Sequence, residues 1–456
     1  MIDSNIPAFL SDMQEVEKLF YCGQEFNIIH CFKKSENKFV NTITVDGQTY
    51  AYGNYVGNIT DEIEEKRLTK RYAKLSLYKA LERKTGISLP WGALTGIRPT
   101  KLAYDTLEKE GEFKSFFTNT MKVSEEKAIL TEMVINSQKL IYDKNDDNTD
   151  FFVFIPFCPS RCKYCSFICT DVKTSSNYVE EYVDALIEEI EYSKNFIKKL
   201  RSIYIGGGTP VSLSNENLRR VLKAISSINN GVEFTVEAGR PDVITKENLD
   251  ILYDYGVNRI CINPQTFCDE TLVKLNRNHT ANDVIEKFNL AKDRFSINMD
   301  FIAGLEGEDF SVFKNSINTA ISLKPDNITV HTLCVKKGSH LAVEGKFLGK
   351  GQVELMVDYA RNSLIKNGYN PYYLYRQKYM AGNLENVGYS LKGKECVYNV
   401  DTMEEISSTI ACGANAISKR VKNAQNLVER YASPKDVVTY LSKLEKIKVG
   451  KTLLFK

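Results

Sequence analysis

The chain has 456 residues, 43% hydrophobic and 26% charged, which is enough for about two to three domains with buried cores and excludes disordered and fibrous proteins. Its 60 basic and 58 acidic side chains leave a net charge of +2, so no nucleic-acid partner is expected. No apolar run approaches the ~18 residues of a membrane span, and residues 1–17 lack the basic and apolar segments of a signal peptide, so we expect a cytoplasmic protein.

Residues 1–147 are predicted to form a small α+β domain, whose role the sequence does not indicate. The runs Phe26–Phe32 and Phe39–Tyr52 predict an antiparallel sheet with Asp46-Gly47 as a tight turn. Helical patterns follow at Glu62–Leu81 and Ser124–Tyr142. The polar run 144–150 marks the boundary to the next domain.

Residues 148–348 alternate short β-branched or aromatic runs with amphipathic helical patterns, which is typical of βα units and a parallel sheet. The predicted strands are Phe151–Pro156, Ser202–Gly206, Glu233–Glu237, Arg259–Asn263, Ile297–Ile302 and Ile328–Leu333. The predicted helices are Tyr178–Leu200, Glu216–Ile228, Lys246–Tyr255, Asn282–Asp293 and Phe310–Leu323. Thr245 is the expected N-cap of the third helix, and Gly256 its stop.

Six such units are too few for a closed eight-stranded barrel, so the fold class is predicted as α/β with an open, partial (β/α)6 barrel. Its functional face should lie at the C-terminal ends of the strands. Residues 349–456 are predicted to form a mostly helical C-terminal region, with helices at Gln352–Asn367 and Glu405–Lys422.

Cys158, Cys162 and Cys165 form a C-x3-C-x2-C motif directly after the first strand of this barrel. Three thiolates on one short loop can hold a compact soft-metal centre. A [4Fe–4S] cluster bound by three cysteines leaves one iron open to an amine and a carboxylate, such as the methionine end of S-adenosylmethionine. The alternative is a zinc site with Cys169 as fourth ligand, but zinc modules usually pair two close-spaced ligand motifs and no second pair is present.

The phrase IPFCPSRCKYCSF around these cysteines resembles the cluster loop of the radical S-adenosylmethionine superfamily. It is most similar to the group of oxygen-independent coproporphyrinogen III dehydrogenases and their haem-chaperone relatives, with likeness from about Phe151 to Ser418. Pro90–Lys101 and Tyr372–Ser390 resemble a Gram-positive-type subfamily. The resemblance implies anaerobic porphyrin and haem biosynthesis, in which a 5′-deoxyadenosyl radical drives decarboxylation of coproporphyrinogen III to protoporphyrinogen IX. It also implies a one-electron reductant such as flavodoxin or ferredoxin.

The same resemblance assigns cofactor contacts. A glycine loop follows the second strand, where glycines allow close approach and offer N–H donors to a carboxylate. The family's contacts to S-adenosylmethionine map onto Phe152, Tyr164, Gly207, Gly208, Thr209 and Glu237, with Glu237 facing the α-ammonium group. Gln265, Arg277 and Asp300 match positions that contact a second S-adenosylmethionine molecule.

Several of these positions have simpler alternatives. Glu237 could cap a loop, and Arg277 could be a solvated surface residue. For Asp300 a functional role is favoured over such an alternative, because a charged residue inside an apolar strand is costly unless it is paired or functional. Arg240, Arg376 and Lys378 are candidate partners for the substrate's propionates, or ordinary solvated charges. His331 is expected to be a core histidine.

The sequence also departs from the dehydrogenase pattern. Phe152 and Phe154 stand where those enzymes have Tyr and His, and Ser166-Phe167 follow Cys165 where the better-known enzyme has a fourth cysteine. The C-x3-C-x2-C-x-Phe form is shared with the haem-chaperone branch. A haem-binding protein without decarboxylase activity is therefore the main alternative, and a radical enzyme with another substrate is a further one.

Overall fold

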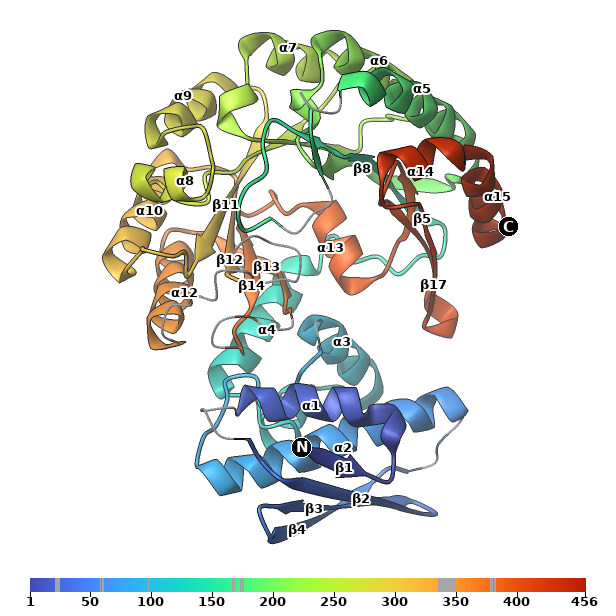
Figure 1. Ribbon diagram of the computed structural model, residues 1–456, viewed down its shortest axis with the longest axis vertical. Helices are drawn as coiled ribbons and strands as arrows, with labels where there is room; N and C mark the ends of the chain where they lie inside the picture. The colour runs from blue at the N-terminus through green and yellow to red at the C-terminus, as the bar shows by residue number, and fades with distance from the viewer. Residues whose placement is uncertain are drawn as a thin grey trace. The chain divides into compact units, whose positions relative to one another are not determined.

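The computed structural model describes residues 1–20, 25–57, 59, 61–96, 98–165, 169–172, 176–334, 350–377, 380 and 383–456. The chain divides into two units (Figure 1). Unit 1 comprises Met1–Glu132 together with Arg376–Lys378, and unit 2 comprises Met133–Tyr375 and Tyr379–Lys456. No helix in the described part of the chain is both long enough and apolar enough to cross a membrane.

Unit 1 is built on a four-stranded sheet in the order β1-β2-β3-β4. The strands are β1 (Ile2–Ser4), β2 (Ile28–Ser35), β3 (Lys38–Val45) and β4 (Gln48–Tyr55), and the last three are antiparallel. Asp46 and Gly47 form the β3–β4 turn with φ of +46° and +82°, the left-handed conformation that a tight hairpin requires. The predicted antiparallel sheet and its turn are confirmed.

The helices of unit 1 are α1 (Leu10–Leu19), α2 (Glu62–Thr85), α3 (Pro99–Glu110) and α4 (Glu125–Gln138), the last of which continues into unit 2. Helix α2 begins where the Asp61 side chain accepts the backbone N–H of Glu64, and it packs on β3. The predicted helices at Glu62–Leu81 and Ser124–Tyr142 correspond to α2 and α4.

Unit 2 contains an eleven-stranded sheet in the order β13-β14-β12-β11-β10-β9-β8-β5-β15-β16-β17. Its centre is six parallel strands: β5 (Asn148–Ile155), β8 (Lys199–Gly207), β9 (Glu233–Gly239), β10 (Arg259–Ile262), β11 (Ser296–Ala303) and β12 (Asn327–Thr332). The predicted partial (β/α)6 barrel is confirmed, with every predicted strand at its expected place.

Helices cover the outer side of this curved sheet (Figure 1). They are α5 (Ser176–Ser193), α6 (Asn215–Ser226), α7 (Lys246–Asp254), α8 (Asp269–Lys274), α9 (Ala281–Ala291) and α10 (Phe310–Leu323). Thr245 caps α7 in a capping box with Asn248, and Gly256 follows that helix at φ +79°, as predicted. The predicted extension of the first helix to Leu200 is wrong, because α5 ends at Ser193 and β8 begins at Lys199.

Residues after 349 extend the same sheet on both sides. They add β13 (Asn370–Tyr375) and β14 (Asn386–Ser390) beside β12, and β15 (Ser408–Cys412), β16 (Ile417–Lys422) and β17 (Leu427–Ala432) beside β5. The helices of this region are α12 (Lys350–Lys366), α13 (Val397–Glu404), α14 (Val437–Ser442) and α15 (Leu444–Phe455). The predicted helix Gln352–Asn367 is confirmed as α12.

The predicted helix Glu405–Lys422 is wrong. This segment forms β15 and β16 instead, joined by a turn in which Gly413 has a φ of +108°. All of β15 is buried because it pairs in parallel with β5. A short apolar run of this kind fits a buried strand as well as a helix, and only the pairing with a distant strand decides between them.

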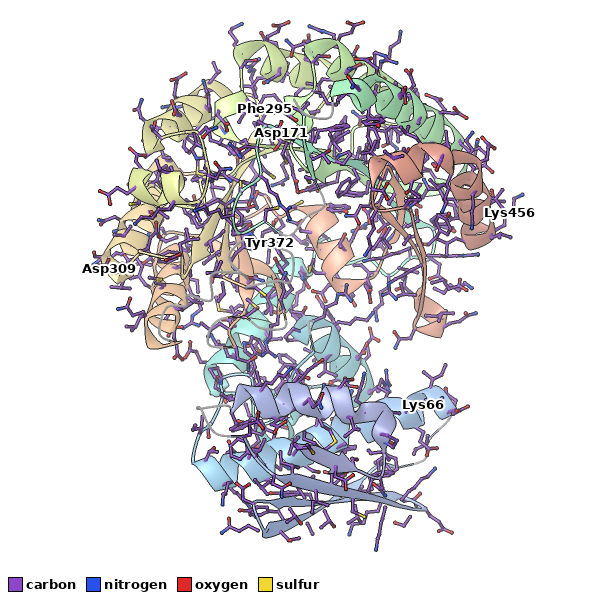
Figure 2. All side chains as sticks on the ribbon, viewed as in Figure 1. Lys66, Asp171, Phe295, Asp309, Tyr372 and Lys456 are labelled. Atoms are coloured by element: carbon purple, nitrogen blue, oxygen red, sulfur yellow. The ribbon has the colours of Figure 1, made fainter. Side chains whose placement is uncertain are left out.

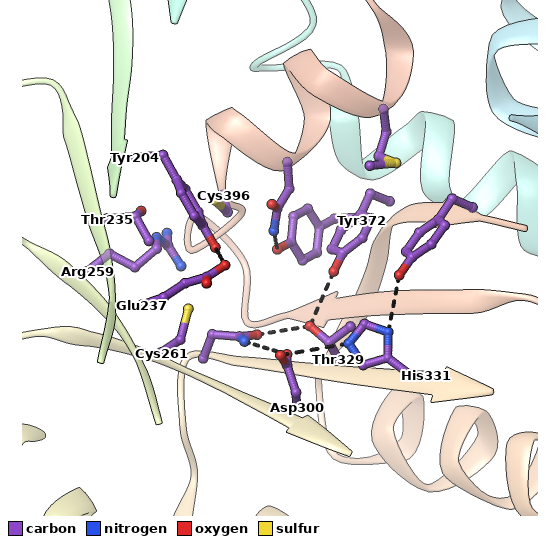
Figure 3. A pocket seen from close by; sticks show the side chains of 15 residues that line it. Tyr204, Thr235, Glu237, Arg259, Cys261, Asp300, Thr329, His331, Tyr372 and Cys396 are labelled. Atoms are coloured by element: carbon purple, nitrogen blue, oxygen red, sulfur yellow. Dashed lines mark hydrogen bonds and ion pairs between the residues drawn. The ribbon is translucent and has the colours of Figure 1, made fainter. Parts of the chain in front are cut away.

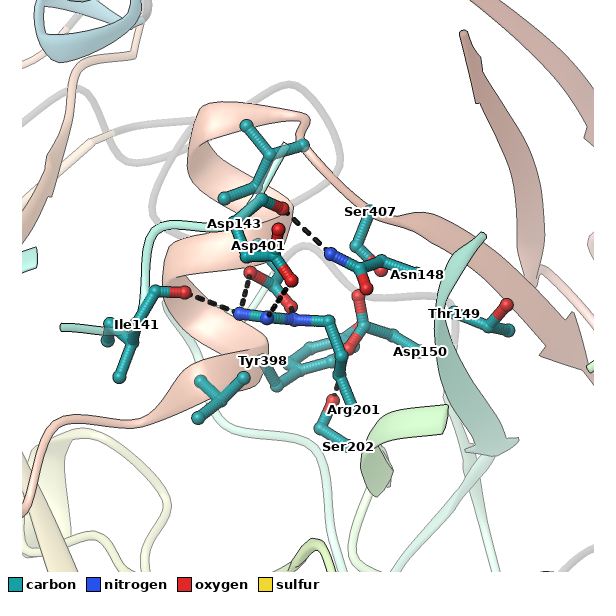
Figure 4. Close-up of polar contacts among 12 residues, drawn as sticks. Ile141, Asp143, Asn148, Thr149, Asp150, Arg201, Ser202, Tyr398, Asp401 and Ser407 are labelled. Atoms are coloured by element: carbon teal, nitrogen blue, oxygen red, sulfur yellow. Dashed lines mark hydrogen bonds and ion pairs between the residues drawn. The ribbon is translucent and has the colours of Figure 1, made fainter. Parts of the chain in front are cut away.

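Helix α13 is tied to the barrel by Arg201 of β8 (Figure 4). The guanidinium donates to both carboxylate oxygens of Asp401 at 2.6 and 3.0 Å and to the carbonyl of Ile141 at 2.5 Å. Burial raises the pKa of Asp401 to about 6, although Arg201 opposes the shift. Tyr372 of β13 lies in the interior of the same unit, whereas Asp309 and Lys456 lie at its periphery (Figure 2).

Candidate cluster and cofactor site

The cysteine loop begins where β5 ends. Cys158 closes the short strand β6 (Phe157–Cys158), which pairs with β7 (Thr170–Asp171), and the N–H of Cys165 donates to the carbonyl of Cys162 at 3.1 Å. The Thr209 hydroxyl lies 3.7 Å from the Cys158 sulfur. Ser166 and Phe167 lie outside the described residues. The loop thus stands at the C-terminal face of the barrel, as predicted.

Cys169 lies beside Cys158. A hydrogen bond between these thiols lowers the pKa of Cys158 to about 7, while the same contact, followed by burial, raises the pKa of Cys169. Within the described residues, no three His, Cys, Asp or Glu side chains are grouped closely enough to hold an ion. The donors nevertheless fit an iron–sulfur cluster: three soft thiols on one loop, backed by a glycine cradle.

That cradle is the loop after β8. The N–H of Gly208 donates to the carbonyl of Ile155 at 2.7 Å, and a Cβ on Gly208 would lie 2.4 Å from the backbone oxygen of Phe157. Gly207 adopts a φ of +100° and directs its N–H to Glu237 Oε2 at 3.2 Å. Only glycine fits these two positions, and the loop brings the predicted Gly207, Gly208 and Thr209 against the cysteine loop and Glu237.

Glu237 lies two residues before the end of β9 and faces the barrel interior. Its Oε1 accepts the phenol of Tyr204 at 2.7 Å (Figure 3). Burial raises the pKa of Glu237 to about 7, although the bonds from Tyr204 and Gly207 oppose the rise. A nearby cationic ligand would favour the carboxylate, so the group suits an ammonium partner better than it suits a loop cap.

Glu237 lines a cavity of about 190 Å³ inside the barrel (Figure 3). Alternate residues of successive strands point into it, as a period of two dictates. They are Thr235 and Glu237 of β9, Arg259 and Cys261 of β10, Asn298 and Asp300 of β11, Thr329 and His331 of β12, and Tyr373 and Tyr375 of β13. Glu237 and Asp300 were predicted from the sequence, whereas Thr235 and Asn298, which lie two residues away on the same strands, were not.

Asp300 and His331 face each other across neighbouring strands. Oδ2 of Asp300 lies 3.7 Å from Nε2 of His331, whose Nδ1 lies 3.3 Å from the phenol oxygen of Tyr375. Burial raises the pKa of Asp300, but hydrogen bonds from His331, Asn298 and Thr329 outweigh burial, and the net pKa is below the usual value. His331 therefore lines the cavity, and its predicted role as a core histidine is wrong.

Gln265 follows β10 with a φ of +69°, a conformation that non-glycine residues rarely adopt. Its N–H donates to the carbonyl of Asp300 at 2.9 Å, and its own carbonyl accepts the N–H of Ile302 at 3.1 Å. These bonds hold the strained residue at the edge of the site. Backbone strain of this kind tends to gather at functional positions.

Arg277 is 4% exposed, so the solvated alternative for this residue is wrong. It donates to the phenol oxygen of Tyr164 at 2.8 Å and to the carbonyl of Asn263 at 2.5 Å. The Tyr164 ring packs on Leu275, Ile302 and Leu305. Arg277 and Tyr164 thus meet beside the cysteine loop.

Two other candidates within the described residues are already engaged by aromatic neighbours. The Phe152 ring stacks on Tyr204 and Tyr398, with centroids 6.0 and 5.9 Å away. Arg376 belongs to unit 1, where its guanidinium lies 5.3 Å over the Trp91 ring. It is buried there and its solvated alternative is wrong, while Lys378 lies outside the described residues.

The model of the radical SAM superfamily matches residues 152–320. The oxygen-independent coproporphyrinogen-III oxidase-like protein HemZ of Bacillus subtilis is 35% identical over 428 residues, covering 88% of this chain and 85% of that protein. The chain belongs to this family of radical SAM proteins. Its cofactors are a [4Fe–4S] cluster and S-adenosylmethionine, and the residues described above fit both.

Two further comparisons are with a heme chaperone and with a solved oxidase structure. The heme chaperone HemW of Bacillus subtilis is 37% identical over 193 residues, which cover 41% of this chain and 50% of that protein. The solved structure of coproporphyrinogen III oxidase (HemN) from Escherichia coli aligns with a TM-score of 0.54 at 20% identity, covering 71% of this chain and 74% of that one. At that identity the match concerns the fold alone.

Proposed function

We propose that this family member catalyses the oxygen-independent oxidative decarboxylation of coproporphyrinogen III to protoporphyrinogen IX. The observation that carries the proposal is similarity along 88% of the chain to an oxidase-like protein, against 41% for the heme chaperone. In this proposal Cys158, Cys162 and Cys165 hold the cluster. Gly207, Gly208, Thr209 and Glu237 hold S-adenosylmethionine, with contributions from Phe152 and Tyr164.

The reaction balances as two equal steps. Each step removes a hydrogen atom from the β-carbon of one propionate, breaks the bond between its α-carbon and the carboxylate carbon, releases CO2 and passes one electron to an acceptor. A vinyl group remains. The cluster and S-adenosylmethionine, when bound, supply the 5′-deoxyadenosyl radical that takes the hydrogen atom.

The protein's own side chains would bind and orient the cofactor. Glu237 would hold the α-ammonium group of S-adenosylmethionine, and the charged Asp300 would favour a cationic group over an anionic one at its own position in the cavity. The cavity of about 190 Å³ is below the roughly 300–1,000 Å³ of typical ligand sites, so we place the tetrapyrrole ring outside it. Gln265, Arg277 and Asp300 are the proposed contacts of a second S-adenosylmethionine.

The test is anaerobic turnover of the reconstituted protein with a one-electron reductant, S-adenosylmethionine and coproporphyrinogen III. The proposal expects 5′-deoxyadenosine and CO2 to form together. If a protein with verified iron and sulfide content forms neither product, the proposal is wrong.

A second candidate is haem binding without decarboxylation. It is favoured by the 37% identity with the heme chaperone and by Phe152 and Phe154, which put apolar rings where the dehydrogenases have polar ones. Titration with haem would show one bound haem per chain, and coproporphyrinogen III would remain unchanged in the turnover assay.

A further inference from the structure

Two buried arginines converge on one cysteine of the cluster loop. Nη1 of Arg240 lies 3.4 Å from the sulfur of Cys162, and Nη1 of Arg277 lies 3.8 Å from the same atom. The arginines are 78 and 115 residues further along the chain than Cys162, and each is 4% exposed. The sulfur of Cys158, by contrast, accepts a hydrogen bond from the neutral hydroxyl of Thr209.

Arg240 is held rigidly in this position. It follows β9, and its Nε and Nη2 each donate at 2.9 Å to one oxygen of Asp242, a two-pronged pairing that fixes the plane of the guanidinium. The remaining nitrogen, Nη1, is directed at the loop, where it also donates to the Ser160 hydroxyl at 3.1 Å. The guanidinium cannot turn away from Cys162 without breaking the pair with Asp242.

Arg277 is held by neutral groups, the Tyr164 phenol and the Asn263 carbonyl. None of the described carboxylates forms an ion pair with it, and its buried Nε has no hydrogen-bond partner in the described residues. Burial, followed by the charge of Arg277, lowers the pKa of the nearby His279 to about 3, so this imidazole is neutral. Two guanidinium groups therefore lie beside Cys162, and among the described residues Asp242 is the one carboxylate that forms an ion pair with either of them.

A buried excess of positive charge is costly unless an anion compensates it. Here the group that both cations face is a sulfur atom, which is anionic when it ligates iron. Hydrogen bonds to cluster sulfurs and nearby positive charge stabilise the more negative, reduced state of an iron–sulfur cluster and raise its reduction potential. The two arginines beside Cys162 would therefore influence the one-electron reduction of the cluster.

We propose that Arg240 and Arg277 tune the reduction potential of the cluster through Cys162, as positioning residues that raise the potential by charge-assisted N–H···S bonds. This inference rests on the family's cluster and is independent of the tetrapyrrole substrate in the proposed function. It also gives Arg240 a different role from the propionate partner predicted from the sequence.

The test is an anaerobic redox titration of the reconstituted full-length protein, with the reduced cluster followed by electron paramagnetic resonance and no tetrapyrrole present. The variants are Arg240→Gln, Arg277→Gln and Arg240→Lys, with Arg294→Gln as a control at a surface ion pair with Asp250. For each Gln variant the equilibrium constant for reduction should fall about tenfold, equivalent to ~59 mV for one electron. Arg240→Lys keeps the charge and should shift the equilibrium less, and Arg294→Gln should not shift it.

Iron and sulfide analysis accompanies each titration. Gln variants that hold a full cluster and titrate like the wild type would overturn the inference. Failure of all three arginine variants to bind a cluster would also overturn it, because a tuning contact should leave the three cysteines able to bind iron. Loss of turnover with an unchanged potential would count against the inference while leaving the proposed function in place.

Discussion

The phenol of Tyr204 donates a 2.7 Å hydrogen bond to Glu237 across the neighbouring strands β8 and β9, and the pair forms one wall of the barrel cavity. Burial outweighs this bond and raises the pKa of Glu237 from 4.5 to about 7. The carboxyl is therefore close to half-protonated at neutral pH in the ligand-free protein. This property has a measurable consequence for stability.

We expect the ligand-free protein to lose stability as the pH rises from about 4.5 to about 7. Over this range the unfolded chain has released the Glu237 proton while the folded chain retains it, so the folded state binds more protons and its stability falls by about 3 kcal/mol. The free energy of unfolding, measured with urea at several pH values, should fall less steeply for Glu237→Gln than for the wild type. Identical pH profiles for the two proteins would contradict the assignment.

Gly208→Ala should disturb the cluster loop. The added Cβ would lie 2.4 Å from the backbone oxygen of Phe157 and 2.7 Å from that of Ile155, and backbone atoms cannot move aside as a flexible side chain can. We expect a loss of about 1–3 kcal/mol in unfolding free energy and a lower iron content after reconstitution. Gly96→Ala is the matched control, because a Cβ there meets nothing within 4 Å. Equal iron content in the two variants would show that the cradle does not support the loop.

Asp300→Asn should impair use of the cofactor without removing the cluster. The carboxylate is held charged by His331 and its neighbours, so substitution removes the negative charge that faces His331 at 3.7 Å and accepts the Asn298 amide at 2.7 Å. We expect 5′-deoxyadenosine formation to fall about 10- to 100-fold at unchanged iron and sulfide content. Asp254→Asn, at the exposed end of α7, should leave the rate unchanged. A wild-type rate in Asp300→Asn would remove this residue from the proposed site.

Lys451→Met should strongly destabilise unit 2. Lys451 and Glu189 are both fully buried and pair at 2.7 Å, and the lysine also donates to Ser193 at 2.8 Å. Its removal leaves a buried, uncompensated carboxylate, which typically costs about 3–5 kcal/mol. The control is Lys448→Met on the same helix, whose partners Glu188 and Glu445 are exposed, and it should cost about 1 kcal/mol or less. Urea unfolding of both variants checks the difference, and equal losses would contradict it.

The central barrel could be predicted from the sequence because its signals are local. Each parallel strand is a short apolar run between polar turns, and the Thr245 cap and the cysteine spacing can be recognised within a few residues. The strands β15 and β16 could not be predicted in the same way. Ser408–Cys412 is a strand because it pairs with Thr149–Val153, more than half the chain away.

The site could likewise be predicted only in part, because some of its features are local in the sequence and others depend on contacts between distant segments. Asp300 stood out because a charged residue inside an apolar strand is costly unless it is paired or functional, whereas Glu237 was predicted from the resemblance to the family. The convergence of Arg240 and Arg277 on Cys162 was not visible, since it depends on how the cysteine loop meets the segments that follow β9 and α8. Burial also decided between the alternatives for Arg277 and His331, which sequence alone left open or misjudged.

The most direct test of the proposed function is the stoichiometry of products from one anaerobic reaction with S-adenosylmethionine, a one-electron reductant and coproporphyrinogen III. Chromatography would quantify porphyrins and nucleosides, and CO2 would be measured alongside. The proposed reaction predicts two CO2 molecules for each protoporphyrinogen IX, with 5′-deoxyadenosine formed in step and neither product formed without reductant. Nucleoside formation with unchanged coproporphyrinogen, from protein with an intact cluster, would contradict the proposed substrate.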